Sequence, residues 1–103
     1  VAAVREGDVV ELGELDVPPK MTRAPTVVYP PVAARSRIET SVIVTALVSE
    51  SGDVLEVRVL RGDSRFGFND AAIRAIRNMR FSPPMKDGKR VKTWFPQTVN
   101  FRL

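Results

Sequence analysis

The sequence predicts an α+β fold built on a small three-stranded antiparallel sheet. Two runs of alternating apolar residues flank Ser51-Gly52, a helical pattern covers residues 69–79, and a third β-rich run ends at Leu103. Alternation with a period of two is typical of strands, and apolar spacings of three and four are typical of an amphipathic helix. A chain of 103 residues has room for one domain with a modest core.

Composition excludes several classes of function. Apolar residues make up 44% and charged residues 27%, as in ordinary globular domains. The net charge of +4 favours acidic partners without the charge density of a committed nucleic-acid binder. The chain has no Cys and no His, which excludes disulfides, thiolate metal sites and Ser–His or Cys–His nucleophile pairs. We therefore predict no catalytic residues, no cofactor and no metal site.

The N-terminal part divides into an extension and the start of a domain. Residues 1–28 hold one short apolar patch, Val9–Leu12, among prolines and show no sustained period. They are expected to form a linker with room for one short strand, ahead of a domain at residues 29–103. At Tyr29-Pro30-Pro31, proline precedes an alanine-containing segment and suits a first helical turn. We predict a short helix to about Ile38.

The next two runs predict a hairpin. Residues 41–50 carry apolar side chains on both faces, as expected for a central strand: Val42, Val44, Ala46 and Val48 on one, Ile43, Thr45 and Leu47 on the other. Gly52 can adopt the positive φ of a tight turn. Leu55, Val57 and Val59 then continue the alternation in a second strand.

A helix and a last strand complete the fold. Asn69 is expected to cap a helix beginning at Asp70, and Pro83 with Pro84 to stop it. Its apolar stripe is Phe68, Ala72, Ala75, Ile76 and Met79. The last strand covers residues 91–103, with Phe95, Gln97, Val99, Phe101 and Leu103 on one face. Pro96 favours a sheet edge, and the helical crossover predicts the strand order second, first, last.

These residues, in this order, resemble the C-terminal domain of TonB, the periplasmic energy transducer of Gram-negative bacteria. The resemblance spans about residues 29–103 and rests on Tyr29, Pro30, Gly52, Ala72, Phe81, Pro83, Gly88 and Phe101. It implies two helices packed on one face of the three-stranded sheet. It also implies a non-enzymatic periplasmic domain, tethered to the inner membrane by a segment outside these residues.

The resemblance further implies partners. An ExbB/ExbD-type proton-driven motor would act through regions outside this chain. An extended, TonB-box-like segment of an outer-membrane or envelope protein would add as a strand to the last strand, because an edge strand offers unpaired main-chain groups. We predict a docking rim at that edge, with Arg102 favouring an acidic segment: Lys92, Thr93, Trp94, Gln97, Thr98, Val99, Asn100 and Arg102.

Several alternatives stay open at this stage. The same fold is compatible with another trans-envelope machine, such as a gliding-motility or secretion apparatus, and the open edges are compatible with a homodimer. A small basic nucleic-acid binder is disfavoured, because the exposed sheet positions lack interleaved aromatic and basic residues. Trp94 is either a partner anchor or packed under the helices. The patch Val9–Leu12 is either linker or a strand that competes for the open edge.

Overall fold

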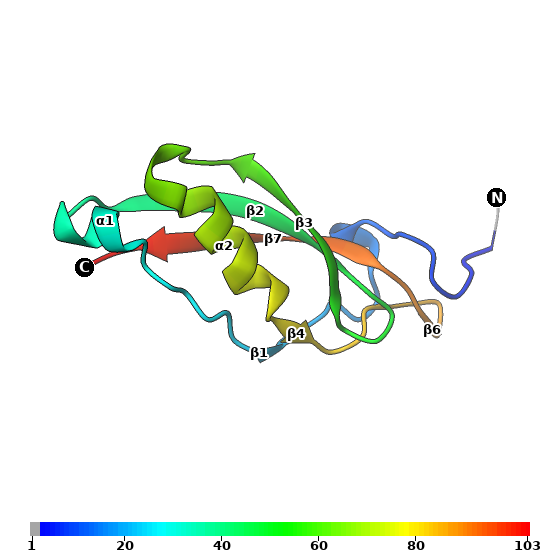
Figure 1. Cartoon of the computed structure of the whole chain (residues 1–103). Helices are drawn as coiled ribbons and strands as arrows, with labels where there is room; N and C mark the ends of the chain where they lie inside the picture. The colour runs from blue at the N-terminus through cyan, green and yellow to red at the C-terminus, as the bar shows by residue number, and fades with distance from the viewer. Residues whose placement is uncertain (1–2) are drawn as a thin grey trace.

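Three strands form the central sheet of the computed structural model, which describes residues 3–103. Strand β2 (Thr40–Val48) lies between β3 (Val54–Arg61) and β7 (Thr93–Phe101), and both pairings are antiparallel. This confirms the predicted strand order. Helix α2 (Phe68–Arg77) crosses one face of the sheet, and α1 (Pro31–Arg35) lies at one end of it (Figure 1). The molecule is elongated, with extents of 53 × 24 × 17 Å.

β2 has the two-sided character predicted for a central strand. Val42, Val44, Ala46 and Val48 are at most 1% exposed and belong to the main core cluster. Ile43 and Leu47 alternate with them and are half-buried on the opposite face. β2 pairs with β7 over nine residues without a shift of register, from Thr40 opposite Phe101 to Val48 opposite Thr93.

The apolar stripe of α2 is confirmed, but its two ends differ from the prediction. All five stripe residues, from Phe68 to Met79, are at most 1% exposed. The helix begins at Phe68 with Gly67 as its N-cap. Asn69 is not the cap, because its Oδ1 accepts the N–H of Asp63 at 2.8 Å. The helix ends at Arg77, ahead of the proline pair, because Arg80–Phe81 form strand β4.

β3 departs from uninterrupted alternation because it contains two bulges. One register shift falls between Leu47 and Val48, which brings Val54 rather than Leu55 opposite Val48. Leu55 is therefore 56% exposed, and its predicted place on the apolar face is wrong. Val57 and Val59 remain on the predicted face of β3, opposite Ala46 and Val44. Leu103, predicted to share the apolar face of the last strand, lies past the end of β7 and is 65% exposed.

Two small sheets extend the molecule beyond the predicted elements. β1 (Met21–Arg23) pairs with β4, and β5 (Met85–Lys86) pairs with β6 (Lys89–Arg90) through a turn at Asp87 and Gly88, both at positive φ. The described residues also form two short 3-10 helices, η1 (Leu12–Glu14) and η2 (Arg65–Gly67). Residues 7–23 are hydrogen-bonded at intervals to residues 80–92, so this part of the extension lies along the domain.

No helix in the described residues is both long and apolar enough to span a membrane.

Candidate functional site

β7 forms one free edge of the central sheet. It pairs with β2 on one side, and within residues 3–103 no further backbone segment is hydrogen-bonded to it between Thr93 and Phe101. A free edge strand presents a row of unpaired N–H and C=O groups. This row is the chemical feature that an extended peptide can bind.

The direction of the main-chain groups along this edge follows from Lys92. Its N–H and C=O bond to Asp8 and Val10, on the side away from β2. Main-chain groups alternate in direction along a strand, so positions 94, 96, 98 and 100 also point to the free side. Pro96 stands at one of these positions, where its missing N–H removes no bond to β2. The free donors of the edge are therefore the N–H groups of Trp94, Thr98 and Asn100.

Two members of the predicted docking rim cannot contact a partner through their side chains. Thr93 is 0% and Val99 3% exposed. Both follow the alternation that puts Phe95, Gln97 and Phe101 on the helix-covered face, opposite the buried positions of β2. Gln97 is half-buried on that face, and its Nε2 donates to the C=O of Thr98 at 3.1 Å. The alternation of β7, rather than its polarity, decides which side chains reach the rim.

The remaining rim residues point to the face without helices. Trp94 is half-buried there, opposite Leu47, and the Arg58 guanidinium lies 4.6 Å from the centre of its ring. The interpretation that packs Trp94 under the helices is therefore wrong. Asn100 is exposed, and its Oδ1 accepts a hydrogen bond from Ser41 Oγ at 2.7 Å. The exposed side chain of Arg102 also donates to Ser41 Oγ, at 3.4 Å.

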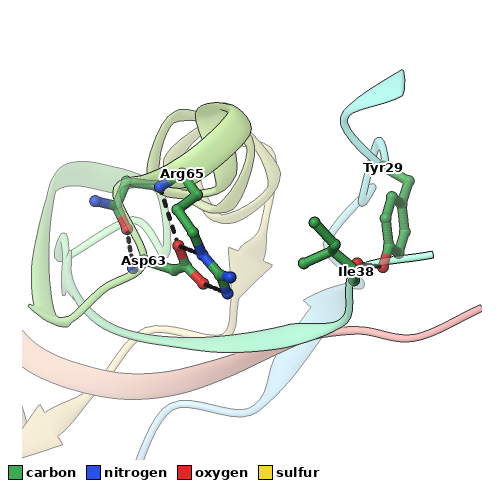
Figure 2. A network of polar contacts seen from close by, with 5 residues as sticks. Tyr29, Ile38, Asp63 and Arg65 are labelled. Atoms are coloured by element: carbon green, nitrogen blue, oxygen red, sulfur yellow. Dashed lines mark hydrogen bonds and ion pairs between the residues drawn. The ribbon is translucent and has the colours of Figure 1, made fainter. Parts of the chain in front are cut away.

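The residues that carry the family resemblance are structural. Tyr29 stacks edge-on against Phe68 and Phe101, with ring centroids 6.1 Å and 5.7 Å away. Its hydroxyl donates to the C=O of Ile38, as Figure 2 shows. Burial, followed by the nearby Glu39, raises the pKa of Tyr29. The others lie in the core, at a helix start, in turns or in the loop between β4 and β5: Pro30, Gly52, Ala72, Phe81, Pro83, Gly88 and Phe101.

A second polar network fixes the loop between β3 and α2. The Arg65 guanidinium forms a bidentate pair with the carboxylate of Asp63: Nε donates to Oδ1 at 3.0 Å and an Nη donates to Oδ2 at 2.7 Å (Figure 2). The backbone N–H of Arg65 also donates to Oδ1, at 3.0 Å. The Arg65 side chain, and then its N–H, hold the pKa of Asp63 far below its usual range. The network orders the loop that leads into α2.

Asp63→Asn is expected to lower the free energy of unfolding at pH 7 and to lower it by a smaller amount at pH 2.5. A lowered pKa in the folded state stabilises the fold fully above the unfolded value of about 3.9. That contribution is lost as the pH falls from there through the folded-state pKa. Urea unfolding of both proteins at pH 7 and at pH 2.5 measures the difference. If the free energies of unfolding of the two proteins differ by the same amount at both pH values, the ion pair of Asp63 with Arg65 does not cause the stabilisation.

Comparison with known proteins assigns the chain to a family. The family model of the Gram-negative bacterial TonB protein C-terminal matches residues 25–103. The chain belongs to this family. The TonB-family assignment covers the whole central sheet and both α-helices, and it confirms the resemblance seen in the sequence.

Two relatives show how much of a TonB protein the chain represents. Protein TonB2 of Pseudomonas aeruginosa is 28% identical over 75 residues, which are 73% of this chain but 28% of that protein. The solution structure of the Pseudomonas aeruginosa TonB C-terminal domain superposes with a TM-score of 0.69 at 26% identity, covering 91% of this chain and 93% of that one. The chain thus spans under a third of TonB2 and nearly all of the C-terminal domain.

One feature of the edge falls outside the predicted rim. Asp8 and Val10, in the N-terminal extension, form main-chain hydrogen bonds with Lys92. The patch Val9–Leu12 was compatible with either a linker or a strand that competes for the edge, because pairing through main-chain atoms has no specific sequence pattern.

Proposed function

We propose that this TonB-family domain is a periplasmic protein-interaction module that transmits force from an inner-membrane motor to an outer-membrane or envelope partner. Binding is by addition of an extended partner segment to the free edge of β7. The observation that carries the proposal is the row of outward-facing main-chain groups from Trp94 to Asn100, which no other backbone segment in residues 3–103 pairs with. Membership of a Gram-negative energy-transducer family supports the periplasmic setting.

Strand addition suits a contact that must bear load and then be released. Each main-chain hydrogen bond contributes only about 0.5–1.5 kcal/mol net, so a few of them give reversible binding. Pulling along the strands loads these bonds together. β7 is itself anchored over its full length by β2, so force reaching the edge passes into the centre of the sheet. An ExbB/ExbD-type motor would act through parts of the protein outside this chain.

Edge recognition also explains why the side-chain chemistry of the site is modest. Main-chain pairing supplies affinity, and pockets for alternate side chains supply specificity. On the open face, a partner side chain beside Trp94 would meet its ring and the Arg58 guanidinium. The guanidinium is itself paired with Glu56 Oε2 at 3.2 Å, so this position offers a partner an aromatic surface beside a neutralised charge.

A titration tests the proposal. Backbone amide shifts of the isotope-labelled chain are recorded while peptides from the periplasmic N-termini of outer-membrane proteins are added. We expect shifts concentrated at Trp94, Thr98 and Asn100, and a matched peptide with proline at alternate positions should produce none of them. Peptides that leave these amides unmoved while the β2 signals show a folded sheet contradict strand addition at β7.

A further inference from the structure

Lys92, one residue before β7, faces the same side as the outward-facing row, and its main-chain groups are bonded to the chain's own N-terminal extension. The N–H of Lys92 donates to the C=O of Asp8 at 2.8 Å, and its C=O accepts the N–H of Val10 at 2.9 Å. Val9 lies opposite Lys92 in a parallel bridge. Gly7 continues the contact, with its N–H 2.9 Å from the C=O of Arg90. We call residues 4–17 the N-terminal strap.

The strap and the segment beneath it carry opposite charges. Residues 4–17 contain five acidic residues and one arginine, whereas residues 85–92 contain four basic residues and one aspartate. Asp16 lies 3.6 Å from the Nζ of Lys86 and accepts the N–H of Asp87 at 2.7 Å. Lys89 and Lys92 donate from Nζ to the C=O groups of Val4 and Gly7, at 2.6 Å and 3.0 Å. The segment leading into β7 is thus suited to an acidic extended strand.

The main-chain hydrogen bonds between the strap and the edge end at Val10. Its chain turns through η1 and returns to Met85, whose C=O accepts the N–H of Asp16 at 3.0 Å and whose N–H donates to Val17 at 3.0 Å. Figure 1 shows the strap at the end of the molecule where β6 leads into β7. It therefore pairs with Lys92, and η1 lies beside β7 without forming a main-chain hydrogen bond to residues 94–100.

We infer that the N-terminal strap is an intramolecular competitor for the partner-binding edge, and that the strand it competes with is extended, acidic and β-branched like the strap itself. The inference rests on the proposed function, because it assumes that partners bind β7. From Trp94 to Asn100 the strap forms no main-chain hydrogen bond that a partner strand would have to replace. A partner gains hydrogen bonds to Lys92 and Arg90 only by displacing the strap, because these main-chain groups can pair with one strand at a time.

Two adjacent proline substitutions in the full chain test the pairing without any partner. In Val10→Pro, the N–H that donates to Lys92 is lost, whereas the N–H of Val9 points away from β7 by alternation, so Val9→Pro is the matched control. We expect hydrogen exchange at the Lys92 amide to be at least about tenfold faster in Val10→Pro and nearly unchanged in Val9→Pro. Equal exchange in both proteins overturns the inference.

A second pair of variants keeps the inference testable if Val10→Pro fails to fold. Gly7 has a φ of +83°, and a Cβ there would lie 2.8 Å from Glu50 Oε2. Gly7→Ala should therefore loosen the strap, and Gly13→Ala, where a Cβ meets nothing within 4 Å, is its control. Protection of the Val44 amide in β2 reports whether each protein stays folded.

Competition itself is tested with a synthetic peptide that copies residues 4–12, added in trans. We expect it to shift the Arg90 and Lys92 amides of Val10→Pro, and to bind that variant about tenfold more tightly than Val9→Pro, because the freed edge raises the binding-competent fraction. No shift at Lys92 in the loosened variant overturns the competition. Outer-membrane peptides that fail at Trp94 to Asn100 would contradict the proposed function separately, since the Lys92 readouts use none of them.

Discussion

Gly52→Ala is expected to lower the free energy of unfolding by about 3 kcal/mol, from the sum of backbone strain and overpacking. Gly52 has a φ of +88°, and a Cβ there would lie 1.8 Å from the carbonyl oxygen of Phe81. The same contact holds a hydrogen bond in which the N–H of Phe81 donates to the C=O of Gly52 at 2.9 Å. The β2–β3 turn must therefore separate from β4 to admit a methyl group.

Hydrogen bonds within the β2–β3 turn explain why the turn cannot easily shift to remove this clash. Ser49 is 4% exposed, and its Oγ accepts the N–H groups of Ser51 and Asp53 at 3.2 Å and 3.1 Å. The C=O of Ser49 also accepts the N–H of Gly52, at 3.0 Å. Shifting the turn to accommodate the new methyl group would break these bonds as well as the contact with Phe81.

Gly88→Ala is the matched control for this prediction. Gly88 has a φ of +76°, but a Cβ there meets nothing within 4 Å. It should therefore lose only the strain of a positive φ, about 1 kcal/mol. Urea unfolding of the three proteins at pH 7 measures both effects. Equal losses in the two variants would show that the approach to Phe81 contributes nothing.

The central sheet was predictable because β2 and β7 place alternate residues in the core. The alternation of Val42, Val44, Ala46 and Val48 indicated β2, and Pro96 indicated that β7 lies at an edge. Leu55 was misplaced because a bulge changes which residue faces the core, and a bulge has no apolar pattern of its own. The ends of α2 were shifted for a related reason. Asn69 has the side chain of a good cap, but the loop before it provides a competing donor at Asp63.

The candidate site was predictable only in outline. Edge strands bind through main-chain groups, which every residue carries apart from the N–H that proline lacks, so no side-chain pattern marks the positions that point outward. Alternation settles this once the register with β2 is known, and it places the side chains of Thr93, Gln97 and Val99 on the helix-covered face. The residues of the family resemblance did not help, because Gly52, Phe81 and Phe101 stabilise the fold rather than contact a partner.

Thr98→Pro is expected to weaken binding of the partner segment at least about tenfold while leaving the domain folded. The N–H of Thr98 is one of the free donors of β7, and its loss also places a proline ring where the added strand must approach. The sheet should tolerate the change, because Pro96 already occupies a position with the same outward direction two residues earlier. Titration with a peptide that binds the unmodified chain measures the effect.

Thr98→Val is the control that separates main-chain from side-chain recognition. It keeps the outward N–H and the β-branched shape of an exposed residue and removes only the hydroxyl. If β7 binds by strand addition, Thr98→Val should bind nearly as well as the unmodified chain, and Thr98→Pro should not. If both variants bind equally well, the partner does not pair with this edge. If both fail equally, with the β2 amides still protected, the hydroxyl rather than the backbone makes the contact.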